Sequence, residues 1–153
     1  MVPLLCSISF IINYILTYNN NLGDGVSYKF QTDIDPSAEP KDVYLKNAKV
    51  DWKSLLGKFT FGLQGMNVFN VAEKTWGFRF LKKSPMDEHE FSSAADMGVG
   101  YSGTFSNFNY SLMVVNGTGY KMNEDNKHKK ISGQLVYGEK NLVKNSGINL
   151  GLA

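Results

Sequence analysis

One pattern recurs along most of this chain: apolar side chains alternate with polar ones at every second position. In residues 26–33, Tyr28 and Phe30 alternate with Lys29 and Gln31. A period of two is that of a β-strand, whereas an α-helix repeats its faces every 3.6 residues. The pattern therefore predicts a chain built from strands with one apolar and one polar face.

The alternation returns in a series of further segments. They are residues 10–18, 43–53, 58–66, 96–105, 108–116, 131–137 and 148–152. Lys46 breaks the pattern, because it falls on the apolar side of its segment. Only Ser106 and Asn107 separate two of the segments, which is the spacing of a β-hairpin with a tight turn. We predict an all-β fold, an antiparallel meander of about eight strands in one domain covering residues 1–153.

The connections between these segments alternate in length. The long ones are residues 34–42, 67–95 and 117–129, and the short ones are 54–57, 106–107 and 140–145. In a meander every second connection lies at the same end of the sheet. Outer-membrane β-barrels are built in this way, with short turns at one end and long loops at the other.

The composition of the two faces separates a membrane barrel from a soluble β-protein. Aromatic residues flank the short turns on the apolar face: Trp52 and Phe59, then Phe105 and Phe108, then Tyr137. Aromatic rings at one level are typical of a membrane interface. The opposite face is polar and suits a water-filled interior. These features predict a partial transmembrane β-barrel with the lipid bilayer as its partner.

The predicted barrel assigns a side to each charged or amide residue of the strands. The side chains expected to line the lumen are Lys29, Gln31, Lys49, Asp51, Gln64 and Asp96. The alternation is still running where the sequence stops at Ala153, so we expect a fragment whose first and last strands are unpaired.

The beginning of the chain is strongly apolar, and it contains the only cysteine. Residues 4–16 are the most apolar stretch, but no Lys or Arg precedes them and no small-residue cleavage site follows. Residues 1–25 are therefore predicted to be a strand and turn, with the remnant of a signal peptide as the alternative. Cys6 is the only cysteine, which excludes an internal disulfide and a cysteine-based metal site.

Charge and motifs exclude other classes of function. The chain has 16 basic and 14 acidic residues without a long basic run, which argues against nucleic-acid binding. No glycine-rich phosphate loop or nucleophile elbow occurs, so we expect neither an enzyme nor a cofactor. The acidic and histidine residues at 87–90 adjoin one another on a loop and lack ligand geometry, so no metal site is expected.

Residues 67–95 form the unusual segment. Loops longer than about 15 residues usually carry function or are disordered. This one contains Trp76, Phe78, Phe80 and Leu81, which is too apolar for disorder. These side chains have to pack on something, and in a porin the available place is the barrel interior. We therefore predict that the segment folds inward as a constriction loop.

The cations of this loop are the candidate constriction residues. Arg79, Lys82 and Lys83 have i, i+3, i+4 spacing, so one helical turn would place them on one face. A rigid guanidinium in a constriction suits anions. The alternative is structural: Arg79 pairs with Glu73, Asp87 or a carboxylate of the barrel wall and fixes the loop.

Several of these segments resemble a known family. They are Lys58-Phe-Thr-Phe-Gly-Leu-Gln64, Arg79-Phe-Leu-Lys-Lys-Ser84, Ser93-Ala-Ala-Asp-Met-Gly-Val99, and Val114-Val-Asn-Gly-Thr-Gly119 with Asp125-Asn126-Lys127. Together they are similar to the bacterial phosphate-selective porin family over roughly residues 10–140. Lys82 stands where that family often has Glu, and its basic ladder is not identifiable here. The resemblance implies a larger barrel in the bacterial outer membrane, often a homotrimer, and does not establish phosphate as the permeant.

The expected function is therefore that of an outer-membrane porin fragment. It would pass small hydrophilic solutes or ions by passive diffusion, with a mild preference for small anions. Two alternatives remain open. One is a small closed outer-membrane barrel with a structural or adhesion role. The other is a soluble β-barrel lipid carrier, which would turn Phe61, Tyr101 and Leu112 inward around its ligand.

Overall fold

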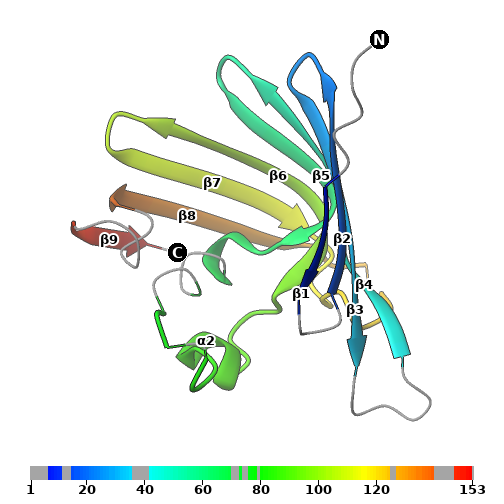
Figure 1. Cartoon of the computed structure of the whole chain (residues 1–153). Coiled ribbons are helices and arrows are strands. Elements are labelled where there is room, and N and C mark those ends of the chain that lie inside the picture. Colours follow the sequence, from blue (N-terminus) through cyan, green and yellow to red (C-terminus); the bar gives the residue numbers. More distant parts are fainter. Residues whose placement is uncertain are drawn as a thin grey trace.

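The alternating segments form a single antiparallel sheet in the computed structural model. The structure describes residues 7–11, 15–35, 42–69, 73, 76–78, 80–124, 127–139 and 147–152. Within these residues nine strands pair in sequence order (Figure 1). They are β1 Ser7–Ile11, β2 Ile15–Gly23, β3 Val26–Asp35, β4 Asp42–Ser54, β5 Gly57–Gly65, β6 Ala95–Phe105, β7 Phe108–Val115, β8 Lys130–Gly138 and β9 Asn149–Leu152. The predicted all-β antiparallel meander is confirmed.

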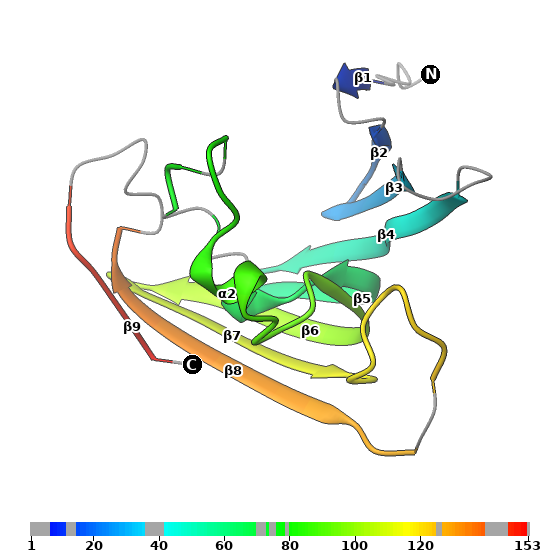
Figure 2. The same ribbon diagram turned by 90° about the horizontal axis from the view of Figure 1, so that it is seen from below.

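The sheet is open, as expected. In the described part of the chain β1 and β9 each pair with one neighbour, and they do not pair with each other. Seen from below, the strands curl into an open trough (Figure 2). The outer edges of β1 and β9 are therefore unpaired within the described chain.

The N-terminal part differs from its prediction. The run expected as one strand over residues 10–18 is divided between β1 and β2, which reverse direction so that Ile11 lies opposite Ile15. The alternation continues through this reversal without a Gly or Pro to mark it, so the pattern could not locate the turn. Cys6 lies outside the described residues. None of the helical segments in the described chain has the length and hydropathy of a membrane-spanning helix.

The two faces of the sheet differ in polarity. The outer face carries large apolar side chains that are exposed. They include Phe30, Val50, Trp52, Phe61, Met97, Val99, Phe105, Phe108, Leu112, Val114, Ile131, Leu135 and Tyr137. Cross-strand pairs such as Phe61 opposite Val99 keep these side chains on one side from strand to strand. The other face, called the inner face below, carries the polar positions.

Lys46 breaks the alternation because β4 contains a bulge. The register with β3 shifts between Gln31 and Thr32, so β4 carries one extra residue at this point. Lys46 Nζ lies 2.7 Å from Asp33 Oδ2, which places this lysine with the partly buried polar residues of β3. The irregular position in the sequence is thus a bulge that directs a cation toward an inner-face carboxylate.

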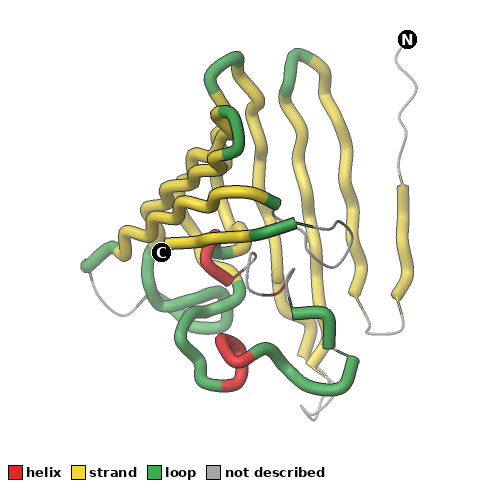
Figure 3. Tube along the Cα trace, turned by 90° about the vertical axis from the view of Figure 1, so that its left-hand side faces the viewer, coloured by secondary structure: helices red, strands yellow, loops and turns green. Residues whose placement is uncertain are grey.

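The long β5–β6 connection lies over the inner face. Figures 2 and 3 show its chain, with the short helix α2 (Pro85–Glu88), within the curve of the sheet. Met66 and Phe69 are buried there against Met113 and Val115 of β7. We call residues 66–94 the inward segment.

The apolar side chains expected to hold the inward segment are not the ones that do so. Phe78, Phe80 and Leu81 are 58%, 81% and 74% exposed. Trp76 is partly buried, and its Nε1 donates to the carbonyl of Lys82 within the same segment. The expectation that these side chains pack on the wall is wrong for the three exposed ones. Met66 and Phe69, which follow β5 closely in sequence, make the contact with the sheet instead.

Candidate functional site

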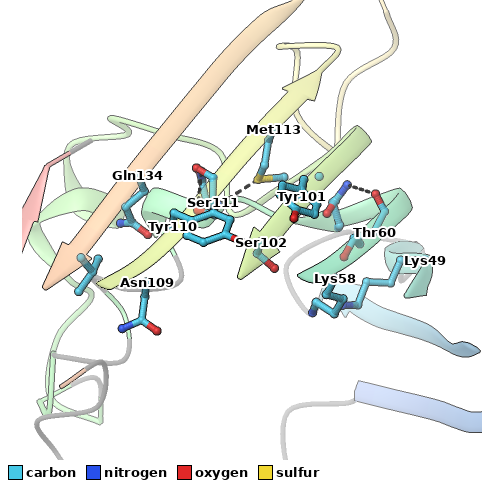
Figure 4. A pocket seen from close by; sticks show the side chains of 15 residues that line it. Lys49, Lys58, Thr60, Tyr101, Ser102, Asn109, Tyr110, Ser111, Met113 and Gln134 are labelled. Atoms are coloured by element: carbon cyan, nitrogen blue, oxygen red, sulfur yellow. Dashed lines mark hydrogen bonds between the residues drawn. The ribbon is translucent and has the colours of Figure 1, made fainter. Parts of the chain in front are cut away.

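A polar hollow of about 220 Å³ lies between the inner face and the start of the inward segment. Its lining includes Lys49, Lys58, Thr60, Ser102 and Gln134. Figure 4 shows the two lysines at one end of the hollow and Gln134 with Asn109 at the other. The strands position these groups, because every second residue of β4 to β8 points to this side. The hollow can therefore hold water or a small polar solute.

Asn67 fixes the inward segment above this hollow. Its Nδ2 donates to Ser111 Oγ at 3.0 Å and to the Ser132 carbonyl at 3.2 Å. Ser132 Oγ donates to Asn67 Oδ1 at 2.7 Å, and the Val68 amide donates to the same oxygen at 2.9 Å. One buried side chain thus connects the inward segment to both β7 and β8. The position of the segment is determined by polar contacts as well as by apolar burial.

Charged side chains gather on β3, β4 and β5. The group, called the β3–β5 charge cluster, consists of Lys29, Asp33, Lys46, Lys49, Asp51 and Lys58. Lys49 Nζ lies 2.8 Å from one oxygen of Asp51, and Lys58 Nζ lies 3.6 Å from the other. With Lys46 paired to Asp33, four lysines face two aspartates. The cluster therefore carries a formal charge of +2.

Lys29 is the cation of this cluster that stands outside these ion pairs. It is partly buried and lies directly opposite Lys49 across β3 and β4, with Asn19 opposite it on β2. Like charges directly opposite each other in a sheet are unfavourable. A negatively charged group close to Lys29 would relieve this repulsion.

The other predicted lumen residues also lie on the inner face, but their roles differ. Gln31 accepts a hydrogen bond from Asn47 Nδ2 at 2.9 Å, and Gln64 Nε2 donates to two backbone carbonyls beside the hollow. Asp96 is 2% exposed, and its Oδ2 accepts from the Gly117 amide at 2.7 Å. Asp96 thus holds the β7–β8 loop and presents no charge to solvent.

The predicted constriction cations are not gathered at the charge cluster by the described contacts. Arg79 lies outside the described residues. Lys82 and Lys83 are exposed, and Lys82 Nζ lies 3.6 Å from Glu88 within the inward segment itself. The cations with a defined place on the inner face are those of the strands.

Three residues of the candidate site were not predicted from the sequence: Asp33, Lys46 and Asn67. Lys46 and Asp33 could have been found from the break in alternation, which is the sequence sign of a bulge. Asn67 gave no such sign, because its partners are 44 and 65 residues away in sequence. No group of three or more His, Cys, Asp or Glu side chains in the described residues could hold a metal ion.

Comparison with protein-family models, with curated proteins and with solved structures finds no match for this chain. The resemblance to the phosphate-selective porin family therefore stays a prediction.

Proposed function

We propose that this sheet is part of the wall of an outer-membrane diffusion channel for small hydrophilic solutes or ions. The observation that carries the proposal is the difference in polarity between the two faces of the sheet. Large apolar side chains are exposed on the outer face, while the polar inner face is curved around the inward segment. Soluble monomers rarely expose contiguous apolar patches beyond a few hundred Å². A lipid-facing wall has this arrangement throughout.

An aromatic belt at the short-turn end supports a membrane interface. Neighbouring rings cross the outer face at centroid distances of 5.6, 4.7 and 5.8 Å, joining Trp52, Phe59, Tyr101 and Tyr110 in that order. Phe108, on the same strand as Tyr110, and Tyr137 of β8 continue the belt with their ring centroids 5.0 Å apart. Such rings favour the boundary between hydrocarbon and water.

The open edges indicate what completes the wall. An unpaired strand edge in lipid costs several kcal/mol for each unsatisfied backbone group, and membrane barrels are closed for this reason. Under the proposal, further strands pair with β1 and β9 to close a larger barrel in the bacterial outer membrane. The homotrimer that the porin resemblance implies belongs to this proposal as well.

The inner face supports a mild preference for anions. The β3–β5 charge cluster has two more lysines than aspartates, while the amides and hydroxyls around the hollow are neutral. The inward segment would narrow the passage, and Arg79, Lys82 and Lys83 remain its proposed constriction cations. Selection would then combine size exclusion with electrostatic bias.

Adjacent residues of β8 test the proposed function directly. Gln134 lines the hollow, whereas Leu135 is exposed on the outer face. In Cys6→Ser protein placed in planar lipid bilayers, a membrane-impermeant cationic thiol reagent should alter the conductance of Gln134→Cys. It should leave the conductance of Leu135→Cys unchanged, because lipid covers that side chain. Modification of Leu135→Cys with protection of Gln134→Cys would refute the assignment of the faces, and an absence of conductance from the whole barrel would refute the channel.

Lys29 provides a separate prediction on selectivity. We expect Lys29→Glu to move the reversal potential of the channel in a salt gradient toward cations, because the change lowers the formal charge of the cluster from +2 to zero. Lys127→Glu makes the same change of charge on the exposed β7–β8 loop and serves as the control. Equal shifts in the two variants would assign selectivity to net charge and not to this part of the wall.

A soluble lipid carrier is the weaker alternative. It requires Phe61 and Leu112 to surround a ligand inside the barrel. Both side chains are instead exposed on the face opposite the inward segment. A small closed barrel is equally disfavoured, since β1 and β9 occupy opposite edges of the sheet.

A further inference from the structure

The turn between β4 and β5 has an unusual composition. Leu55 is fully exposed and Leu56 is 81% exposed at the end of this hairpin. Turns of this kind normally carry Gly, Asn, Asp, Ser or Pro. Two adjacent exposed leucines are therefore unexpected at this position. We call residues 53–58 the β4–β5 tip.

The tip is held against the aromatic belt by specific contacts. The hydroxyl groups of Tyr101 and Tyr110 both donate to the carbonyl of Leu56, at 2.8 and 3.1 Å. A Cβ on Gly57 would lie 2.8 Å from the Ser102 carbonyl oxygen, so the close approach requires glycine. The two leucines therefore have a defined place beside the belt.

Two lysines stand at the base of the tip. Lys53 and Lys58 lie directly opposite each other across β4 and β5. Lys58 belongs to the inner face, where it lines the hollow and its Nζ lies 3.6 Å from Asp51. Lys53 is exposed at the rim and borders one open surface together with Trp52, Leu55 and Leu56. The tip thus combines apolar side chains with an exposed cation.

We propose that the β4–β5 tip is an interfacial anchor, in which Leu55 and Leu56 enter the acyl chains of a phospholipid leaflet and Lys53 meets its phosphate groups. The inference rests on the proposed function, because it extends the lipid-facing surface past the aromatic belt to the turn. Two observations identify the occupant: the exposed leucines adjoin the belt, where Tyr101 and Tyr110 bond to Leu56, and the exposed Lys53 beside them matches the charge of lipid phosphates. Long basic side chains at membrane interfaces extend to the headgroups in this manner.

Tryptophan fluorescence can locate the tip in a bilayer. The chain has two tryptophans, Trp52 on the outer face and Trp76 in the inward segment. The full chain is reconstituted in phosphatidylcholine vesicles that contain phosphatidylglycerol and acyl chains brominated near the headgroup. Leu55→Trp, in a Trp52→Phe and Trp76→Phe background, reports on the tip. Trp76→Phe alone leaves Trp52 to report on the outer face.

The anchor predicts that shallow bromine quenches the tryptophans at positions 52 and 55 at least twofold. Quenching at position 52 without quenching at 55 would overturn the anchor and leave the proposed function intact. An absence of quenching at both positions would overturn both. A tryptophan at 55 that is shielded from bromine only at high protein concentration would indicate a second copy on the tip, and this too would overturn the anchor.

Vesicle flotation provides a second measurement with a matched control. We expect the double variant Leu55→Ser, Leu56→Ser to reduce vesicle partitioning by at least about tenfold, since both apolar side chains are removed. Met122→Ser removes another exposed apolar side chain, from the β7–β8 loop, and should have no effect. Lys53→Gln should reduce the preference for phosphatidylglycerol while leaving partitioning into phosphatidylcholine unchanged. Equal partitioning of the leucine variant and the Met122 variant would refute the anchor.

Discussion

Replacing Asn67 by leucine should release the inward segment from the wall. Leucine has nearly the same size but provides none of the hydrogen bonds that connect Asn67 to Ser111 and Ser132. Buried partners left unsatisfied cost about 1–3 kcal/mol each. We expect docking to weaken by about 2–3 kcal/mol, which raises the undocked population roughly 30- to 140-fold. Trypsin cleavage after Lys82 or Lys83, both exposed, should accelerate by a similar factor.

Two further variants make this experiment specific. Asn123→Leu applies the same change to an exposed residue of the β7–β8 loop and should leave the cleavage rate unchanged. Ser132→Ala should reproduce part of the effect, and its combination with Asn67→Leu should be less than additive, because the two side chains bond to each other. Equal cleavage rates for Asn67→Leu and Asn123→Leu would show that Met66 and Phe69 alone hold the segment.

The strands and their faces could be predicted because both depend on local sequence. Side chains in an extended chain alternate regardless of the partner strand, so Tyr28, Phe61 and Leu112 could be assigned to one face from their spacing. The tight turn at Ser106 and Asn107 followed from its length between two alternating segments. The division of residues 10–18 into two strands could not be predicted, because the alternation continues across the reversal.

The docking of the inward segment depends on contacts that are distant in sequence. Met113 and Val115 are apolar residues at inner-face positions, and they mark where Met66 and Phe69 settle. The predicted packing of Phe78, Phe80 and Leu81 on the sheet is wrong, since all three are exposed. Apolar character alone does not reveal which residues of a long loop contact the sheet. Arg79, the residue on which the constriction hypothesis depends, lies outside the described residues and stays a prediction.

Charge on the outer face should have opposite consequences in water and in lipid. Leu112 lies on β7 opposite Tyr101 of β6 and Gly133 of β8, and it is 52% exposed. For a soluble protein, arginine at such a surface position changes stability by about 0.5 kcal/mol or less. On the lipid face of a barrel, an arginine near the bilayer midplane costs about 2–4 kcal/mol. We therefore expect Leu112→Arg to lower the free energy of unfolding in vesicles by about that amount.

Urea titration of the reconstituted barrel, followed by tryptophan fluorescence, measures this difference. Gln134→Arg places the same side chain on the inner face beside the hollow, where water can solvate it, and should cost at most about 1 kcal/mol. The ratio of the two effects distinguishes the faces without knowledge of the permeant solute. Equal small losses in both variants would mean that water, and not hydrocarbon, covers Leu112, and the membrane assignment would then be wrong. A larger loss for Gln134→Arg would reverse the inside and outside of the wall.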